Sequence, residues 1–575
     1  MSFQALNLAA SSLRSQQKAI DVVSHNIANV NTPGYSKQTP NIVTSTPETI
    51  GGLNFGRGVN LNSIQRSVDP LINNAQRENA SQSQFWSTVT SGLTTIESAF
   101  GSLGSTGLAA SVNDFFLAWQ QLSNNPQDMA QKYNVRTKSE TLTSQLNNMH
   151  TQLNNGQMNL DNDITQQVSN ANLKLDEIAS LTKQISAQEA GSQAAANDLR
   201  DQRDEAVRQL AKIIPIQKVA TNDGGLLIQT MGGDLLTQGG TARHLERSPT
   251  VGATGYRGVV IAGTQNTVQG LDQGGTVGGL MKLRDGNFQT YINTLDSFAA
   301  NLAFSTNQLH SNASGSLKSS TLQSAQGSLN PALALNDVTQ GVPFANKVQA
   351  GSFSIHVYDA AGLPQVPTSQ FTVNLAAGAT MNDVATAITT NVTGVTASVD
   401  AAGRLNLNAG TNSMAFADDT SNFLAAYEIN AFFQGQSSGS LALSQAIQND
   451  PAAIHTGQVD ITTSRIQPGD NRAAIAIMNL QDQILSVDGS TPSSLHERVA
   501  GLSSQYGLDV EVAKQQTTYR EAEASSLTQQ RQAISGVSID DELIAMMKFQ
   551  RAYEASAKVI NTSNQMLDTL MGIMR

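Results

Sequence analysis

The sequence predicts an elongated, multidomain α+β protein in which terminal coiled-coil helices and a long helical bundle bracket β-rich middle domains. Three observations predict this class. Apolar residues recur every three or four positions at both ends, residues 129–213 and 493–532 keep helical spacing almost throughout, and the middle consists of short apolar runs separated by glycine. Because helices near the start and the end bracket the β-rich part, we expect the two termini to lie together.

The composition limits the class of partner. A chain of 575 residues exceeds what one hydrophobic core organises, so about three or four domains are expected. Only 14% of the residues are charged, the net charge is −11 and no basic block stands out, which argues against nucleic acid and membrane as partners. Cysteine is absent, so disulfides and thiolate metal sites are excluded. Neither a cleaved secretory signal nor an apolar run of ~20 residues is evident, and we expect export, if any, by a route without a cleaved signal.

Each end carries one apolar stripe with the spacing of a coiled-coil seam. The stripes are Leu6, Leu13, Ile20 and Ile27 near the N-terminus, and Leu543, Met546, Tyr553, Ile560, Leu567 and Met571 near the C-terminus. An isolated helix of this length is marginal in water, and each large residue gains about 1.5–3 kcal/mol on burial. We therefore expect the two ends to pair with each other or with another subunit. The pattern leaves open the alternative of ordinary amphipathic helices on a globular core.

The first helix is predicted to end at Pro33 and Gly34, since proline cannot continue a helix and glycine favours turns. Residues 38–68 change to Thr, Val, Ile, Asn and Gly, which predicts extended, hairpin-like structure. Helical spacing then returns, with Gly156 and Gly191 as expected kinks or turns.

The middle of the chain predicts β-rich domains. Strands with a half-buried alternation are expected at 353–357 and 371–375, a helix at 381–391 and a hairpin at 395–407. The predicted domains are a terminal coiled-coil domain (1–37 with 536–575), an elongated helical domain (38–215 with 280–312 and 465–535), a β-meander region (216–279) and an inserted β-rich domain (313–464).

Motifs for catalysis and metal binding fail in this sequence. His496 and Glu497 begin like a zinc-protease helix, but Ala500 stands where the second histidine is required. The mixed charges of residues 200–205 have the spacing of surface ion pairs on a helix. We therefore predict no enzyme, no cofactor and no metal.

Two terminal segments resemble the signatures of bacterial flagellar axial proteins, the family of rod, hook and hook-associated proteins. Residues 24–35 (SHNIANVNTPGY) resemble the N-terminal signature, and residues 541–570 resemble the C-terminal one. The NTPGY turn, the helical segment after it and GDNR at 469–472 resemble the hook-associated members found at the hook–filament junction. Residues 381–407 look like a module of filament and cap proteins. The turn motif that the resemblance singles out comprises Asn26, Asn29, Thr32, Pro33, Gly34 and Tyr35.

The resemblance implies a structural adaptor outside the cell, exported by the flagellar type III system and assembled as a ring-like layer. It implies that the terminal helices pair around a central channel and that the turn motif shapes the exit from this inner tube. The implied partners are copies of the chain, the hook protein, the next junction protein and an export chaperone at the C-terminal helix.

Three alternatives stay open. Another axial component (hook, rod or filament subunit) is one, although the resemblance implies that filament proteins lack the NTPGY turn and that hook proteins usually have less helix after it. An enzyme inserted into an axial scaffold would need clustered His or acidic residues, and His356 is the one histidine of residues 313–440. A plain cytoplasmic coiled-coil binding protein would not need the paired signatures.

Overall fold

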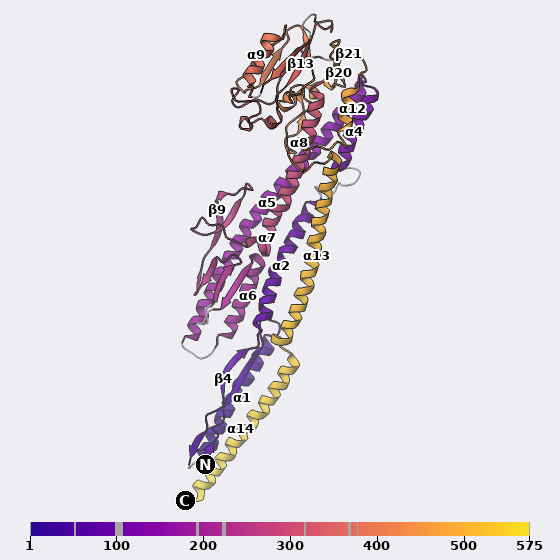
Figure 1. Cartoon of the computed structure of the whole chain (residues 1–575). Coiled ribbons are helices and arrows are strands. Elements are labelled where there is room, and N and C mark those ends of the chain that lie inside the picture. The colour runs from indigo at the N-terminus through magenta and orange to yellow at the C-terminus, as the bar shows by residue number, and fades with distance from the viewer. Residues whose placement is uncertain are drawn as a thin grey trace. The chain divides into compact units, whose positions relative to one another are not determined.

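The chain forms two units whose segments interleave along the sequence. The computed structural model describes residues 2–50, 53–97, 107–190, 195–220, 226–315, 318–365, 370–376 and 378–573. Unit 1 comprises residues 1–92, 159–285 and 510–575, and unit 2 comprises residues 93–158 and 286–509. Long helices and short antiparallel sheets alternate as the α+β prediction requires (Figure 1). The predicted helical domain is divided between the units, because its longest helices contribute to both.

Helices dominate unit 1. They are α1 (Ser2–Ala28), most of α2 (Pro70–Thr95), the second half of α5 (Met129–Glu189), α6 (Asn197–Ile213), α7 (Gly275–Met281) and the second part of α13 (Leu495–Ser535), followed by α14 (Ile539–Ile573). α6 ends because Ile214 precedes a proline and is pushed into the extended region, at φ −134 and ψ 144. Thr90 and Thr517, whose Oγ1 atoms are 3.0 Å apart, and Asn79, which donates to Glu523 at 2.7 Å, hold α2 antiparallel to α13.

Short antiparallel strands cover these helices. The strands of unit 1 are β1 (Gln38–Thr44), β2 (Glu48–Ile50), β3 (Leu53–Phe55), β4 (Val59–Arg66), β5 (Ile216–Ala220), β6 (Leu226–Thr230), β7 (Leu235–Gln238), β8 (Thr241–Ala242), β9 (Leu245–Val251) and β10 (Arg257–Ile261). β1 pairs with β4, which confirms the extended structure predicted for residues 38–68. The meander β5-β6-β7-β8 and the hairpin β9-β10 occupy the predicted β region. A 3₁₀ turn (Leu271–Gln273) leads into α7, and a π-helical turn (Lys282–Phe288) follows it.

Unit 2 combines a helical part with three-stranded sheets. Its helices are α4 (Leu108–Asn124), the first half of α5, α8 (Gln289–His310), α9 (Met381–Asn391), α10 (Phe423–Ala426), α11 (Gln445–Asn449), α12 (Arg472–Asn479) and the first part of α13, with 3₁₀ turns at Val338–Gln340, Ala345–Lys347 and Pro451–Ala453. α5 passes through Gly156 without a break, so a turn, one of the two forms predicted there, is wrong. A Cβ at this position would lie 2.5 Å from the ring of Phe288, so the glycine serves close packing. Gly191 lies outside the described residues.

The strands of unit 2 form four small sheets. They are β11 (Ala313–Ser314), β12 (Thr321–Gln323), β13 (Gly351–Tyr358), β14 (Gln370–Leu375), β15 (Thr396–Val399), β16 (Leu405–Asn408), β17 (Ser413–Ala417), β18 (Phe433–Gln434), β19 (Ala442–Leu443), β20 (Gly457–Asp460) and β21 (Arg465–Ile466). The sheet orders are β11-β20-β21, β12-β16-β15, β14-β13-β17 and β18-β19. α9 and the β15-β16 hairpin occupy the segments predicted for them.

The half-buried alternation predicted for residues 353–357 is wrong. β13 is the central strand of its sheet, and its residues from Phe353 to Tyr358 are all buried. Phe353 and Ile355 on one face enter the core cluster that contains α9, while His356 on the other face contacts the Ser464 hydroxyl at 3.1 Å. Both faces are covered, so neither can be solvated.

Candidate assembly site

α1 and α14 form an antiparallel pair that brings the two ends of the chain together (Figure 1). Two hydrogen bonds define its register. The hydroxyls of Ser12 and Ser556 are 2.9 Å apart, and Asn26 Nδ2 donates to Glu542 Oε2 at 2.9 Å. Each helix advances 14 residues between these contacts, so both keep the same two-heptad period that a coiled pair requires.

The contact line on α1 is built of small residues. Ala9, Ala19 and Val23 are buried between or beside the polar contacts at Ser12 and Asn26. Small side chains at these positions let α14 approach closely. The facing positions of α14 keep alternating steps of four and three, and they are Glu542, Met546, Phe549, Tyr553, Ser556, Ile560, Ser563 and Leu567.

The structure places the predicted seam residues in three different environments. On α1, Leu6, Leu13, Ile20 and Ile27 are half-buried, and the last three lie one position beyond Ser12, Ala19 and Asn26 of the contact line. On α14, Met546, Tyr553, Ile560 and Leu567 are half-buried on the facing stripe. Leu543 is 46% exposed and Met571 is 70% exposed, so α1 does not cover them within the single chain. Whether these ten residues form a seam in an assembly stays a prediction.

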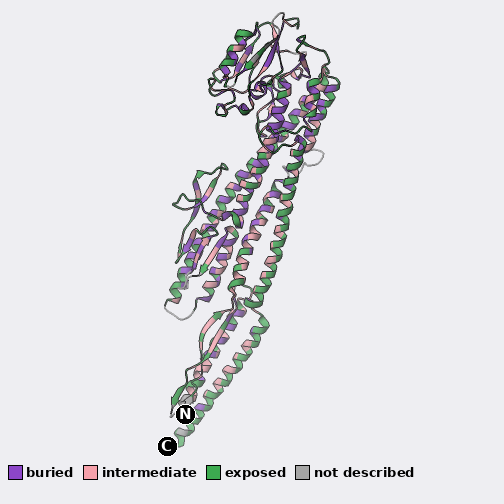
Figure 2. Cartoon of the chain, viewed as in Figure 1, coloured by how far each residue is buried: buried purple, intermediate pink, exposed green. Residues whose placement is uncertain are grey.

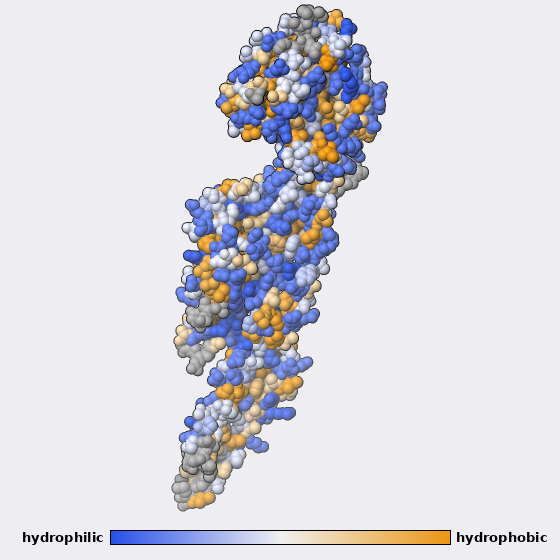
Figure 3. All heavy atoms as spheres, in the orientation of Figure 1, coloured by the Kyte–Doolittle hydropathy of each residue, from blue (hydrophilic) through white to orange (hydrophobic). Residues whose placement is uncertain are grey.

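Other apolar side chains of α14 point away from α1. The outward face of this helix is exposed along its length in Figure 2. Figure 3 shows hydrophobic side chains at the surface of the part of the molecule that α14 occupies. The large exposed apolar residues of α14 are Ile539, Leu543, Ile544, Met547, Val559, Met566, Met571 and Ile573.

Asn26 is the polar centre of the turn that follows α1. Its side chain is 1% exposed and reaches four groups. Nδ2 donates to the Gln38 carbonyl at 2.8 Å as well as to Glu542, and Oδ1 accepts from the Gln38 amide at 3.0 Å and the Tyr35 hydroxyl at 2.7 Å. Lys37 Nζ adds an ion pair with Glu542 at 2.9 Å. One amide therefore joins α1, the first strand and the start of α14.

The remaining residues of the turn motif shape the backbone. Asn29 Nδ2 donates to the His25 carbonyl at 3.0 Å, and Thr32 Oγ1 donates to Asn29 Oδ1 at 3.1 Å, which closes the end of the helix. Pro33 precedes Gly34, whose φ of +85 lies in the region that side chains disfavour. A Cβ on Gly34 would also lie 3.3 Å from Arg208 and Glu205.

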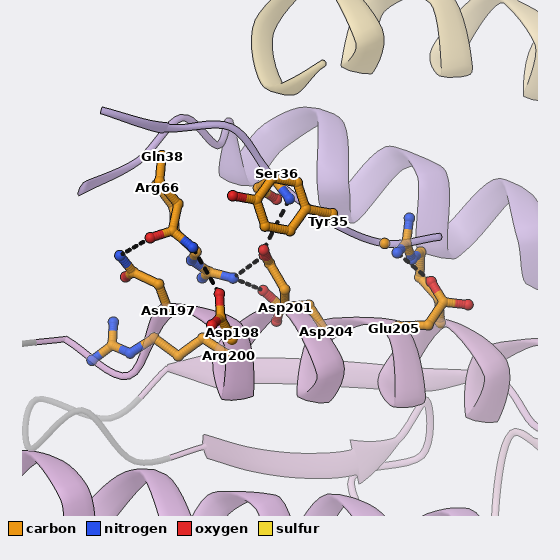
Figure 4. Close-up of polar contacts among 12 residues, drawn as sticks. Tyr35, Ser36, Gln38, Arg66, Asn197, Asp198, Arg200, Asp201, Asp204 and Glu205 are labelled. Carbon is orange, nitrogen blue, oxygen red and sulfur yellow. Dashed lines mark hydrogen bonds and ion pairs between the residues drawn. The ribbon is translucent and has the colours of Figure 1, made fainter. Parts of the chain in front are cut away.

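An acidic face of α6 receives the turn (Figure 4). Asp198 accepts from Gln38 Nε2 at 2.7 Å, and Asp201 accepts from the Ser36 amide at 2.9 Å. Arg66 of β4 binds Asp201 at 2.6 Å and Asp204 at 3.1 Å.

This face corrects the expectation that residues 200–205 form surface ion pairs. Asp201 and Arg203 are both buried, and Asp201 lies against Ser36 of the turn and Arg66 of β4. The contacts of Asp198, Asp201 and Asp204 were missed in the sequence, where the signal was the three-residue spacing of these acids along one helix. Arg531 of α13 also holds the turn, because it donates to the carbonyls of Gly34 and Tyr35 at 3.0 and 3.2 Å.

Burial and neighbouring charges together set the pKa values of the site. Burial, reinforced by Asp198 and Asp201, raises the pKa of the Tyr35 hydroxyl far above its ordinary value, so it remains a neutral donor to Asn26. Burial also raises the pKa of Asp201 against the opposing pull of Arg66. For Asp204, burial acts upward, but Lys218 and Arg66 outweigh it and the pKa is lowered. The cluster is thus a network of paired charges that holds the turn in one position.

A groove of about 940 Å³ runs beside α1 in unit 1. Its walls include Lys18 and Val22 of α1, Leu61 and Ile64 of β4, and Ala196 before α6. Within the described ranges, the acidic, histidine and cysteine side chains form no cluster able to hold a metal ion. Among the same residues, no helix is both long and apolar enough to span a bilayer.

Flagellar protein families match four parts of the chain. "Flagellar hook-associated protein FlgK helical domain" matches residues 93–320, and "Flagellin hook IN motif" matches residues 352–411. "Flagella basal body rod protein" matches residues 6–35, and "Flagellar basal body rod FlgEFG protein C-terminal" matches residues 528–573. The last two ranges contain the α1–α14 pair and the turn motif.

Curated relatives match from end to end. Flagellar hook-associated protein 1 of Salmonella typhimurium is 29% identical over 595 aligned residues that cover 99% of both chains. The chain belongs to the flagellar hook-associated protein 1 family. The family member of Escherichia coli is 28% identical over 99% of both chains, and that of Bacillus subtilis is 24% identical over 100% of this chain and 98% of its own.

A solved member of the family supports the fold. The flagellar hook junction protein FlgK from Burkholderia pseudomallei covers 81% of this chain and 100% of its own length, with a TM-score of 0.51 and 15% identity. The match of residues 352–411 agrees with the resemblance of residues 381–407 to a module of filament proteins.

Proposed function

We propose that this chain is a structural component of the bacterial flagellum that polymerises at the hook–filament junction and is not an enzyme. The end-to-end similarity to flagellar hook-associated protein 1 supports the location. The observation that carries the role is that the terminal helices bear more apolar surface than the chain itself covers. Leu6, Leu13, Ile20 and Ile27 are half-exposed on α1, while Ile544, Met566 and Ile573 are exposed on α14. Surface of this kind marks contact with further subunits.

In this proposal, copies of the chain form a ring-like layer. Leu6, Leu13, Ile20 and Ile27, together with the predicted α14 residues, supply the seam between pairs, and the groove beside α1 offers a concave neighbouring surface. The hook protein lies on one side of the layer and the next junction protein on the other. The turn motif, through its hydrogen bonds with Asn26 and α6, fixes the angle between the α1–α14 pair and the strands that follow α1. A tube built from many copies requires the same angle in every copy.

The proposal extends to the route of the subunit. The chain leaves the cell through the flagellar type III system and works outside it. The exposed apolar side chains of α14 would be bound by an export chaperone, since they would otherwise associate before assembly.

Another axial component is the second candidate, because rod-protein families match both termini. Deleting the gene in the native host separates the two. Hooks without filaments, seen by electron microscopy, with filament protein in the culture medium support the junction. Absent hooks place the protein in the rod or hook, and normal filaments refute a structural role.

A matched pair of variants tests whether the half-exposed apolar stripe of α1 contacts other subunits. Leu13→Glu puts a charge on the half-exposed stripe, and Arg14→Glu puts the same charge on the neighbouring exposed position. We expect the first to fail to restore filaments in the deletion strain although it is exported, and the second to restore them. Equal restoration would show that the stripe makes no contact between subunits.

A further inference from the structure

Two buried histidines lie where the inserted residues leave and rejoin the helical part of unit 2. His310 ends α8, and the chain that leaves there as β11 pairs with β20, with Ala313 opposite Gln458. The inserted segment returns through Asn430, and His455 follows shortly before β20. His310, Asn430 and His455 are called the root clamp below.

Asn430 and His310 hold each other through backbone and side chain. Asn430 has a φ of +51, and its Nδ2 lies 3.4, 3.2 and 3.2 Å from the carbonyls of His310, Ser311 and Ala313. In return, His310 Nδ1 donates to the Asn430 carbonyl at 2.9 Å. The left-handed backbone aims the amide at the end of α8, so this contact is specific to one conformation.

The two imidazoles stack with centroids 5.3 Å apart and an angle of 27° between their planes. His310 Nε2 accepts the backbone N–H of His455 at 3.1 Å. Since Nδ1 donates and Nε2 accepts, His310 is held as one neutral tautomer. His455 Nδ1 is buried without a hydrogen-bond partner among the described residues, so a proton added there gains no acceptor. Both rings are uncharged in the packed state.

We propose that the root clamp is an acid-sensitive latch: protonation of the stacked imidazoles opens the contacts among the end of α8, Asn430 and His455, and so loosens the attachment of the inserted residues. A proton on His310 Nε2 removes the acceptor of the His455 amide. A second proton on His455 then places two cations in a buried stack.

Burial and Lys132 oppose a proton on the rings of the latch, whereas the carbonyls of Asn430 and Ala453 favour one on His310. Lys132 of α5 is buried, donates to the Ala452 carbonyl at 3.2 Å and repels a proton on either ring, while Asp450 acts on Lys132 in turn. The ring of Phe432 packs edge-to-face with His310, and the two ring centroids are 5.5 Å apart. Burial lowers the pKa of His310 to about 4 against the raising effect of the Asn430 carbonyl, and Lys132 adds to the lowering. Burial, followed by His310 and then Lys132, lowers the pKa of His455 well below 6.5.

The sign of the pH dependence follows from these depressed values. An unfolded histidine takes up its proton near 6.5, whereas His310 in the closed clamp resists it down to about 4. The clamp is therefore fully stabilised above pH 6.5 and loses stability as the pH falls, by roughly 300-fold in the closed-to-open ratio for His310 alone. Glu428, two residues before Asn430, titrates in the opposite sense, because burial raises its pKa to about 7.

The chain carries its own reporter. The sequence contains two tryptophans, Trp86 and Trp119. The ring centroid of Trp119 lies 5.3 Å from that of Phe432. In the full-length chain with Trp86→Phe and Glu428→Gln, Trp119 emission and hydrogen exchange at residues 428–435 and 453–458 are followed from pH 7.5 to pH 3.5. We expect cooperative opening on acidification. In this background, His310→Gln or His455→Gln should move its midpoint down by about one pH unit or more.

His244→Gln in unit 1 is the matched control, because that side chain is exposed and bonded to Asp176 at 2.9 Å. An unchanged midpoint in both clamp variants would overturn the proposal, as would an equal shift in the control. If neither clamp variant folds, imidazole NMR titration of the unsubstituted chain decides. Rings that remain neutral until the exchange of residues 428–435 accelerates support the latch. Rings that charge while those amides stay protected refute it.

Discussion

Asn26 offers the sharpest test of the α1–α14 pair, because its single side chain forms hydrogen bonds with Tyr35 of the turn, Gln38 of β1 and Glu542 of α14. Replacement by alanine removes both donor contacts and both acceptor contacts. Each buried polar group that loses its partner costs about 1–3 kcal/mol, and the effects overlap. We therefore expect Asn26→Ala to destabilise the closed α1–α14 pair by about 3–5 kcal/mol.

Asn26→Asp keeps the shape and changes the chemistry. The atom that donated to Glu542 Oε2 at 2.9 Å becomes a carboxylate oxygen beside a buried carboxylate. Two carboxylates in one site favour sharing a proton, so the defect should be greatest at pH 8 and smaller at pH 5. The defect of Asn26→Ala should change little over that range.

Hydrogen exchange of the α14 amides between residues 542 and 556 measures both variants. A loss of about 3 kcal/mol accelerates exchange through opening by about 100-fold. Asn7→Ala, an exposed position on the same helix, is the control and should leave exchange unchanged. Equal protection in Asn26→Ala and Asn7→Ala would refute the role assigned to Asn26. A pH-independent Asn26→Asp defect would refute the contact with Glu542.

Three further predictions concern backbone, charge and pH. Gly34→Ala should destabilise unit 1 by about 1–3 kcal/mol in urea unfolding, because of the positive φ and the crowded Cβ site, whereas Gly56→Ala, with open space around its Cβ, should cost much less. Arg284→Met should cost about 3–5 kcal/mol, since it removes the ion pair with Asp285 beside a buried site and leaves Asp161 with Arg247 alone, and the exposed Arg243→Met should cost almost nothing by thermal unfolding. Glu428 keeps its proton in the folded state up to about pH 7, against 4.5 ordinarily, so the stability it contributes is full below pH 4.5 and is lost as the pH rises through 7. Glu428→Gln should therefore be about 3 kcal/mol more stable than the unsubstituted chain at pH 8 and similar at pH 4.5, by urea unfolding at both values.

Local patterns predicted the elements that depend on neighbouring residues. α9, the β15-β16 hairpin and the long helices of residues 129–189 and 495–535 follow from spacing and turn residues. Gly156 and β13 did not follow, because the sequence does not show what packs against them. A glycine inside a helix signals a turn only when no side chain fills the space beside it, and an alternating strand is half-buried only when one face stays open.

The assembly site also has features that the sequence determines and features that only the tertiary structure determines. The heptad spacing of both ends and the turn at residues 32–35 are properties of the sequence itself, since the coiled-coil period and the backbone limits of Pro33 and Gly34 are local. Only the tertiary structure decided which positions meet. Small residues such as Ala19 form the contact line, and large ones such as Leu13 flank it. Asp201 is buried and accepts a hydrogen bond from the Ser36 amide of the turn. The reason is physical: periodicity defines a stripe on one helix, but the partner's rotation and register determine which edge of that stripe is buried.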